Sequence, residues 1–273
     1  MRSIALVFAW LALGAGASGA DVELIAHRGE SFDAPENTLA AFNLAWERKV
    51  PAFELDVHVT GDGGLIVSHD ADTKRTTGVQ KIIKESTLEE LQKLDAGSWK
   101  GARWAGEKMP TLLKSLRTIP DRGRCFIEIK VGPEAIAPLV DVVRESGKRP
   151  EQLAIISFHA DTIAEAKRKL PQLKAYYLSA FRQDKATQAW TPTADELIRK
   201  AKELKADGLD LAANGPLDRA FVDQVKKAGL EFYVWTVDKP ADARRFVEMG
   251  VDGITTNRPA WMREQLKTDK TAR

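Results

Sequence analysis

The strongest constraint on the fold is an alternation between short apolar runs and amphipathic segments along most of the chain. Short apolar runs are typical of buried strands, whereas apolar residues spaced three and four apart are typical of helices. We predict strands at 22–26, 52–57, 124–129, 153–157, 173–178, 208–211, 231–235 and 253–255. Helices are predicted in the intervals between them, for example over 36–49, 133–146 and 240–249.

Eight strands separated by helices predict an α/β protein with a parallel sheet. Eight such units in about 250 residues match the size of a closed (β/α)8 TIM barrel. The rival is an open doubly wound sheet, which favours a glycine-rich dinucleotide loop after its first strand. Here the first strand is followed by His27-Arg28-Gly29-Glu30. The barrel is therefore the preferred fold.

Residues 70–110 interrupt this rhythm and follow the second predicted strand. Thr87 precedes Leu88-Glu89-Glu90-Leu91, a pattern that predicts a short capped helix. A helix is expected to resume at Pro110. We predict a small insertion that folds over the strand ends and covers them.

The first twenty residues have the pattern of a secretory signal peptide. Arg2 supplies a positive charge, 4–15 is apolar, and Ser18-Gly19-Ala20 provides small residues at a cleavage site. We predict an exported protein, periplasmic or secreted, with a single domain over 21–273 and no membrane span after cleavage. The alternative is an uncleaved N-terminal anchor.

The net charge and the cysteine content of the chain exclude some binding partners and some kinds of cross-link. The formal net charge of the chain is +2 and no basic tract stands out, so the sequence predicts no nucleic acid partner. Cys125 is the single cysteine, which excludes an internal disulfide, and its apolar neighbours predict a small buried side chain. The pattern does not determine the oligomeric state.

Polar and aromatic side chains follow the predicted strands at the point where each strand ends. The active site of a barrel lies at the carboxyl ends of its strands, so we expect these side chains to meet at one mouth. They are His27 and Arg28, Glu54 and Asp56, His69, Glu128 and Lys130, Phe158, and Trp235.

Three of these residues are carboxylates. Glu54 and Asp56 are two apart on one strand and therefore point to the same face, and Glu128 ends the next strand. Close together, they would raise one another's pKa values unless a cation joined them. An all-oxygen set favours Ca²⁺ or Mg²⁺. The alternative is that Arg28 and Lys130 neutralise them as salt bridges.

Two histidines could exchange protons beside such a site. His27 and His69 lie on different segments and could flank a substrate, one as base and the other as acid. His58 shares the parity of the strand's carboxylates but is expected to be exposed at the strand end. His159 is expected at the surface.

The remaining candidates would contact the substrate. Arg28 and Lys130 are fixed positive charges suited to phosphate oxygens. Phe158 and Trp235 could form an apolar wall of the pocket. Asn257 is expected to help close the barrel rather than to take part in the chemistry.

Several motifs carry a resemblance to a known family. They run along nearly the whole chain after residue 20: AHRG at 26–29, APENTLAAF at 34–42, ELDVHVTGDGGLIVSHD at 54–70, IEIK at 127–130, SF at 157–158, VWTVD at 234–238 and GVDGITTNRP at 250–259. In these motifs the chain resembles the glycerophosphodiester phosphodiesterases, within the phospholipase-C-like barrel phosphodiesterases. The resemblance implies catalytic acid/base roles for His27 and His69. It also implies metal binding by the three carboxylates and phosphate binding by Arg28 and Lys130.

The resemblance further implies a reaction, the hydrolysis of a glycerophosphodiester to sn-glycerol 3-phosphate and a free alcohol. Two other functions stay open. One is a phospholipase D-like hydrolysis of lysophospholipids on the same barrel. The other is an exported glycerophosphodiester-binding protein without turnover, although binding alone requires no acid/base pair. The preferred headgroup, the metal, and the choice between water and a neighbouring glycerol hydroxyl as nucleophile are not decided by the sequence.

Overall fold

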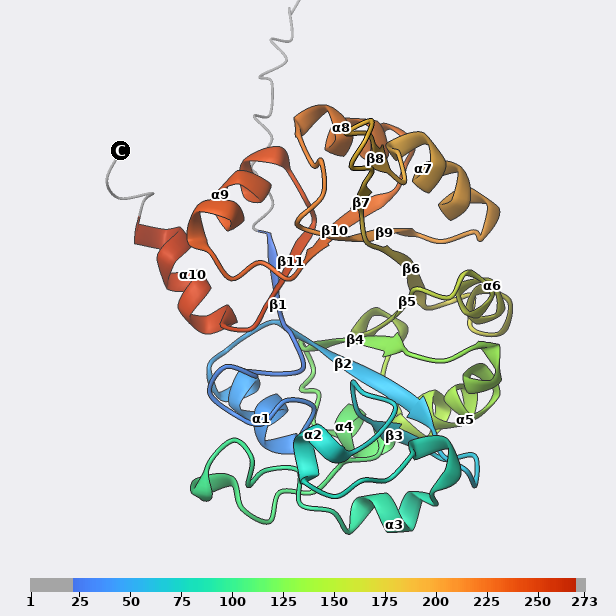
Figure 1. Ribbon diagram of the computed structural model, residues 1–273, viewed down its shortest axis with the longest axis vertical. Coiled ribbons are helices and arrows are strands. Elements are labelled where there is room, and N and C mark those ends of the chain that lie inside the picture. The colour runs from blue at the N-terminus through green and yellow to red at the C-terminus, as the bar shows by residue number, and fades with distance from the viewer. Residues whose placement is uncertain (1–21, 269–273) are drawn as a thin grey trace, which may run out of the picture.

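The computed structural model describes residues 22–268 and shows a closed barrel of parallel strands (Figure 1). The strands are β1 (Glu23–Ala26), β2 (Ala52–Val59), β4 (Arg124–Ile129), β5 (Leu153–Ser157), β6 (Lys174–Ser179), β9 (Gly208–Ala212), β10 (Glu231–Trp235) and β11 (Gly253–Thr256). They are ordered β1-β11-β10-β9-β6-β5-β4-β2, and pairing of β1 with β2 closes the ring. The predicted TIM barrel is confirmed. The predicted signal peptide lies outside the described residues and stays a prediction.

Helices surround the barrel on its outside (Figure 1). They are α1 (Leu39–Glu47), α4 (Leu112–Arg117), α5 (Ile136–Ser146), α6 (Ala160–Lys169), α7 (Ala194–Glu203), α8 (Arg219–Lys227), α9 (Pro240–Met249) and α10 (Pro259–Thr268). Helix α4 begins two residues after the predicted Pro110, because the Thr111 side chain caps it by accepting from the Lys114 amide. Over residues 22–268, no helix has both the length and the hydropathy to cross a membrane.

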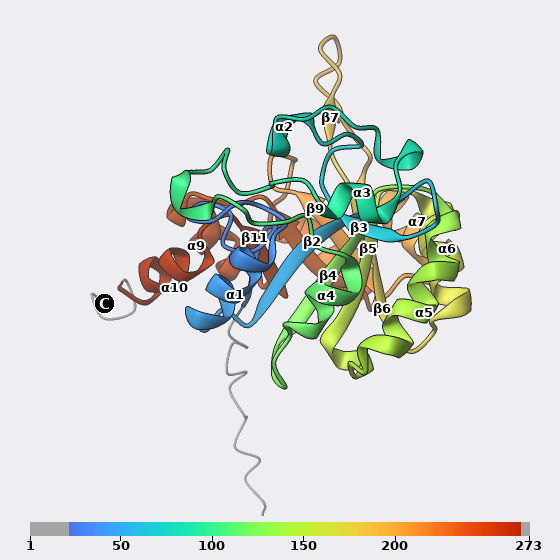
Figure 2. The same ribbon diagram turned by 90° about the horizontal axis from the view of Figure 1, so that it is seen from below.

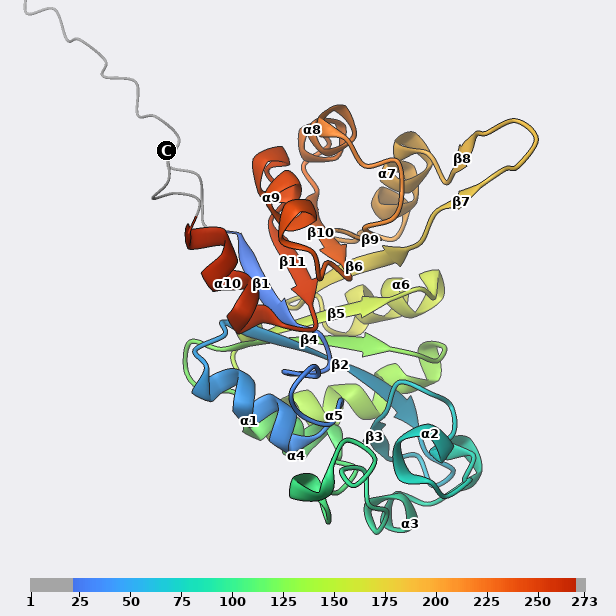
Figure 3. The ribbon, with the colours of Figure 1, turned by 60° about the vertical axis from the view of Figure 1, so that its left-hand side comes forward.

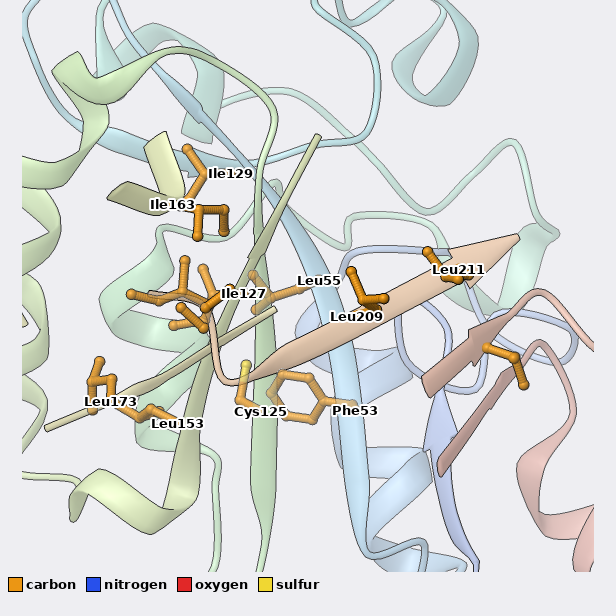
Figure 4. Packing of buried hydrophobic residues seen from close by; sticks show 14 of the residues in the cluster. Phe53, Leu55, Cys125, Ile127, Ile129, Leu153, Ile163, Leu173, Leu209 and Leu211 are labelled. Atoms are coloured by element: carbon orange, nitrogen blue, oxygen red, sulfur yellow. The ribbon is translucent and has the colours of Figure 1, made fainter. Parts of the chain in front are cut away.

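Alternation along the strands divides the core into two layers. Successive side chains of a strand point to opposite faces, so every second residue faces the helices and the others face the barrel axis. Figure 4 shows outward residues such as Phe53, Leu55 and Ile127 packed together, with Cys125 buried among them as predicted. The inward layer contains the aromatic rings of Phe126, Tyr176 and Tyr233. These rings fill the interior and leave the two ends of the barrel to polar residues.

The amino-terminal end of the barrel is closed by ion pairs. Arg124 Nη1 lies 2.5 Å from Glu23 Oε2, and Lys174 Nζ lies 3.0 Å from Glu231 Oε1. The Tyr176 hydroxyl donates to Glu231 Oε2 at 2.7 Å. Each of these carboxylates therefore has a cation or a hydroxyl donor beside it.

The predicted insertion lies at the carboxyl ends of the strands (Figure 3). It follows β3 (Leu65–Val67), which pairs antiparallel with β2, and it contains α2 (Lys74–Thr77), α3 (Leu88–Gln92) and 3₁₀ turns at Ile83–Glu85 and Ala102–Trp104. Thr87 and Glu90 form the capping box expected for α3. A small cluster of its own, which includes Ile83, Leu91 and Met109, holds the segment together.

A hairpin that we did not predict projects from the same end of the molecule (Figures 2 and 3). Its strands are β7 (Arg182–Gln183) and β8 (Trp190–Thr191). Two-residue strands carry too little alternation to be recognised as strands in a sequence. The mouth of the barrel is therefore flanked by two irregular segments, the insertion and this hairpin.

Candidate active site

A cavity of about 290 Å³ lies at the carboxyl ends of the strands. It is lined by His27, Arg28, Glu54, His69, Glu128, Lys130, Ile156, Phe158, Leu178, Asp210, Trp235, Thr236 and Thr255. Eight of the nine residues selected from the sequence are among them, and the ninth, Asp56, is buried beside Arg28 and Lys130. The barrel thus brings the predicted residues of five strands to one place.

A tight turn after β1 places His27 and Arg28 at this mouth. Arg28 and Gly29 both have left-handed backbone angles, with φ of 56° and 81°. A Cβ atom on Gly29 would lie 2.6 Å from Cβ of Ala41, so only glycine allows the turn to pack against α1. The Arg28 amide then donates to Glu54 Oε2 at 2.9 Å, which joins the turn to β2.

His27 is held in one orientation by a side chain that we expected only to close the barrel. The Asn257 Nδ2 group donates to Asp238 Oδ2 at 2.6 Å, so its Oδ1 is the atom facing His27 Nδ1, at 2.8 Å. His27 Nδ1 must then carry the proton and donate it, which leaves the Nε2 lone pair free. Burial, together with the Arg28 charge, lowers the pKa of His27 to about 4. Asn257 thus links β1 to the loop after β11, as expected of a residue that closes the barrel, and its contact with His27 was not foreseen because it arises only on closure.

Asn37 is a second residue that sequence reasoning missed. Its Nδ2 donates to Asp56 Oδ2 at 2.8 Å, and its Oδ1 accepts from the Asp56 amide at 3.2 Å. Asn37 has a left-handed φ of 58°, so α1 begins at Leu39 with Thr38 as its cap, later than predicted. The signal was present in an Asn directly before a good capping residue.

Two buried carboxylates, Glu54 and Asp56, and the partly buried Glu128 form a cluster in which one oxygen of each lies within 4.8 Å of the others. Burial, and then the charges of Asp56 and Glu128, raise the pKa of Glu54 well above its usual value. Burial and Asp56 likewise raise the pKa of Glu128 to about 7. Glu54 Oε1 and Asp56 Oδ1 are buried without a hydrogen-bond partner. Carboxylate oxygens gathered in this way fit a divalent cation with oxygen ligands.

The salt bridges that we considered as an alternative are also formed. Arg28 Nε lies 3.3 Å from Asp56 Oδ2, and Lys130 Nζ lies 3.3 Å from Asp56 Oδ1 and 2.7 Å from Glu128 Oε1. Although burial opposes its ionisation, Arg28 and Lys130 hold the pKa of Asp56 below its usual value. When all three carboxylates are ionised, the two basic side chains leave the cluster with one negative charge, so the salt bridges are compatible with a divalent cation at the same place.

His69 enters the cavity from the segment after β3 and has an acidic partner of its own. Its Nδ1 lies 2.7 Å from Asp70 Oδ1. Asp70 also accepts from Arg75 Nε at 2.6 Å, and both Arg75 and Arg28 bind Glu36. Despite partial burial, the hydrogen bonds from Arg75 and His69 lower the pKa of Asp70 to about 2. The insertion is thereby joined to the turn after β1.

The two remaining histidines lie outside the cavity. The expectation that His58 is exposed was wrong: it is buried, and its Nε2 bonds to the backbone oxygen of His69 at 3.2 Å. Pairing of β2 with the returning β3 covers the strand end that would otherwise be open. His159 is exposed, as predicted.

Phe158 and Trp235 form one wall of the cavity, with ring centroids 5.6 Å apart in an edge-to-face arrangement. Trp235 Nε1 donates to the backbone oxygen of Asp210 at 3.1 Å. Asp210 was not selected from the sequence, although it stands between outward-facing Leu209 and Leu211 on β9 and must therefore point inward. That alternation was the signal that could have found it.

Comparisons with known proteins agree with one another. The family model described as the glycerophosphoryl diester phosphodiesterase family matches residues 27–261. A glycerophosphodiester phosphodiesterase of Caldanaerobacter subterraneus subsp. tengcongensis is 36% identical over 241 residues, which are 86% of this chain and 94% of the relative. Another from Bacillus subtilis is 32% identical and covers 86% of this chain and 83% of the relative. A solved phosphodiesterase of Oleispira antarctica, in complex with the product sn-glycerol-3-phosphate, has a TM-score of 0.80 at 29% identity, covering 89% of this chain and 96% of that chain.

Proposed function

Because the chain belongs to the glycerophosphoryl diester phosphodiesterase family and is an enzyme of that class, we propose that it hydrolyses glycerophosphodiesters to sn-glycerol 3-phosphate and an alcohol at the barrel mouth. One observation carries this proposal. A single cavity brings together two histidines, the carboxylate cluster and two positively charged side chains, those of Arg28 and Lys130. Binding a phosphodiester requires positive charge, and cleaving it also requires groups that accept and supply a proton.

The phosphate would lie against Arg28 and Lys130. A phosphodiester anion repels an approaching nucleophile until its charge is neutralised. Both side chains are less than one fifth exposed, at 18% and 17%, so their charges act in a poorly solvated environment. Their contacts with Asp56 hold the two side chains in place beside the cavity.

Glu54, Asp56 and Glu128 would hold one divalent cation, Ca²⁺ or Mg²⁺. When bound, such an ion supplies further positive charge for the phosphate oxygens and orients the substrate. Glu54 Oε1 supports this assignment because it is buried without a hydrogen-bond partner. Asp56 Oδ1 also accepts no hydrogen bond, although Lys130 Nζ lies 3.3 Å from it.

His27 would be the general base. Its lowered pKa keeps the ring neutral near pH 7, and its Nδ1 proton is engaged by Asn257. The free Nε2 lone pair can therefore accept a proton from the nucleophile. This role holds whether the nucleophile is water or the neighbouring glycerol hydroxyl.

His69 would be the general acid. Asp70 beside it stays ionised and accepts from the Nδ1 side of the ring, which orients the imidazole. A protonated His69 can give its Nε2 proton to the oxygen of the departing alcohol. The two histidines therefore have opposite neighbours, an amide for the base and a carboxylate for the acid.

The test is enzyme-coupled detection of glycerol 3-phosphate. Protein beginning at Asp21 is incubated with glycerophosphocholine or glycerophosphoethanolamine, with Ca²⁺, with Mg²⁺ or with EDTA. We expect continuous release with a metal and none with EDTA. Binding of substrate without any release would contradict the proposal and favour a binding protein without turnover.

A phospholipase D-like activity on lysophospholipids is the second candidate, and one observation favours it. A second cavity of about 360 Å³ shares Arg28 with the first and is lined by the exposed rings of Phe32 and Trp99. Such rings could contact an acyl chain. More of the lining residues are charged than aromatic, so we rank this activity second. Lysophosphatidylcholine cleaved faster than glycerophosphocholine would reverse the ranking.

We also propose that the chain is exported and cleaved after Ala20, on the pattern of residues 1–20. Amino-terminal sequencing of protein recovered outside the cytoplasm should begin at Asp21. An intact amino terminus on membrane-bound protein would favour the uncleaved anchor.

A further inference from the structure

Asp210 is a buried acidic residue for which the proposed mechanism has no use. It lies on β9, lines the mouth cavity and is only 2% exposed. Its Oδ1 has no hydrogen-bond partner. A buried carboxyl group without a partner costs free energy, so its presence in a cavity points to a partner that a ligand brings.

The surroundings of Asp210 offer no cation. Its register partners on the two adjacent strands are Leu178 on β6 and Tyr233 on β10, and the Trp235 indole donates to the backbone oxygen of Asp210 rather than to its carboxyl group. No ion pair involves Asp210 anywhere in residues 22–268. Burial, and then the charge of Glu128, raise its pKa well above the usual value. A carboxyl group in such a setting suits a neutral hydroxyl better than a charged partner.

The position of Asp210 separates it from the metal-binding cluster. In the strand order of the barrel, β9 is four strands from β2 in either direction, so Asp210 faces Glu54 and Asp56 across the mouth. The group of carboxylates that lie within 4.8 Å of one another contains Glu54, Asp56 and Glu128 without Asp210. A substrate held by its phosphate on the side of β2 would reach Asp210 with its far end.

We propose that Asp210 binds the terminal hydroxyl of the glycerol moiety and so selects deacylated glycerophosphodiesters; this inference rests on the proposed function. In such a substrate the phosphate occupies one end of the glycerol, and the terminal hydroxyl lies at the opposite end. A lysophospholipid carries an acyl ester there, which cannot donate a hydrogen bond and would have to enter the space beside a fully buried residue. The reaction that supplies the substrate is then the complete removal of acyl chains from a glycerophospholipid.

The experiment compares three choline esters with one readout, enzyme-coupled choline detection with saturating Ca²⁺. The substrates are glycerophosphocholine, its 2-hydroxypropyl analogue that lacks the terminal hydroxyl, and 1-palmitoyl-lysophosphatidylcholine. The proteins are wild type, Asp210→Ala and the matched control Asp207→Ala. Asp207 is an acidic residue just before β9 whose carboxylate is paired with Lys167 at 2.8 Å.

We expect Asp210→Ala to lower kcat/KM for glycerophosphocholine by about 10- to 100-fold. The same variant should change kcat/KM for the 2-hydroxypropyl analogue by less than about threefold, because the partner hydroxyl is already missing. Wild type should cleave lysophosphatidylcholine at least about 100-fold less efficiently than glycerophosphocholine. Asp207→Ala should leave the relative kcat/KM of the three substrates unchanged.

A purely structural role for Asp210 predicts a different set of results. Removal of an orphaned buried carboxyl group should leave the melting temperature equal or higher, whereas loss of a structural residue lowers it. An equal loss of kcat/KM on all three substrates would overturn the inference, as would weaker Ca²⁺ binding of Asp210→Ala in calorimetry. If wild type releases no choline from glycerophosphocholine with either Ca²⁺ or Mg²⁺, the proposed function itself fails, independently of Asp210.

Discussion

Both ends of the barrel interior contain acidic and basic side chains, but these side chains are paired differently at the two ends. At the amino-terminal end, Glu23 is paired with Arg124, and Glu231 is bonded to Lys174 and the Tyr176 hydroxyl. At the carboxyl end, acids outnumber bases. Within residues 22–268, the buried side-chain polar atoms without a hydrogen-bond partner are all at this end: Arg28 Nε, Glu54 Oε1, Asp56 Oδ1 and Asp210 Oδ1.

This difference in pairing suggests that one end of the barrel contributes to stability and the other to function. A satisfied buried ion pair holds strands together, whereas an unsatisfied polar atom costs free energy unless a ligand completes it. In barrels of this type the active site lies at the carboxyl ends of the strands, which is the end left incomplete here. Substitutions at the two ends should therefore act on different quantities.

The largest effect is expected from His27→Ala at the carboxyl end. Loss of the proposed general base should lower kcat by about 10³-fold with little change in melting temperature. Glycerol 3-phosphate release and thermal unfolding measure the two quantities. His159→Ala is the matched control because His159 is exposed and lies outside the cavity. A His27 variant with wild-type kcat would remove His27 from the acid/base chemistry.

Arg124→Met changes the amino-terminal end and should affect stability rather than kcat. It leaves Glu23 without its cation and should lower the free energy of unfolding by about 2 kcal/mol while kcat is unchanged. Urea unfolding measures the change. Arg144→Met, which breaks an exposed pair with Asp141, should cost less than about 0.5 kcal/mol. A loss of kcat without a loss of stability in Arg124→Met would contradict the division between the two ends.

Asn257→Ala sharpens the comparison within the carboxyl end, because Asn257 positions His27 without lining the mouth cavity. We expect kcat to fall by about 10- to 100-fold with little change in KM. Nitrogen NMR of the imidazole should show loss of the single Nδ1–H tautomer. Ser31→Ala is the control, since the Ser31 hydroxyl donates to the same Asn257 oxygen and not to His27. An unchanged tautomer would mean that Asn257 does not orient the ring.

The stabilisation that a metal ion gives at the carboxyl end should depend on pH. The pKa of Glu128 is raised to about 7, so protons compete with a cation below that pH. Without metal, a carboxyl group with a raised pKa contributes stability at low pH that is lost as the pH rises through about 7. Added Ca²⁺ should therefore raise the melting temperature more at about pH 8 than at about pH 5.5. An equal Ca²⁺ effect at both pH values in thermal unfolding would exclude Glu128 as a ligand.

The smallest effect is expected from Phe158→Ala in the apolar wall. Removing the ring that packs edge-to-face on Trp235 should raise KM by about two- to fivefold and leave kcat unchanged. Initial rates with glycerophosphocholine measure both constants. Val247→Ala is the control because Val247 is exposed on α9, away from the mouth. A changed kcat with constant KM would assign Phe158 to the chemistry rather than to binding.

Much of this protein could be predicted from local patterns. Strand and helix periodicity predicted the eight barrel strands, and the bounds of β4, β5 and β10 agree residue by residue with the prediction. The rule that parallel strands end at one edge then collected nine candidate residues, which the structure places at one mouth. These inferences succeed because each depends on spacing within a single strand or helix.

Other features were decided only by tertiary structure, because they depend on contacts between distant segments. His27 meets Asn257 only after β1 pairs with β11, and His58 is buried only because β3 returns along β2. Asp210 was recognised only when the barrel placed it in the mouth cavity with Oδ1 lacking a hydrogen-bond partner. The sequence determined which side chains can reach the mouth; the closed barrel decided which of them find partners there and which are left for a ligand.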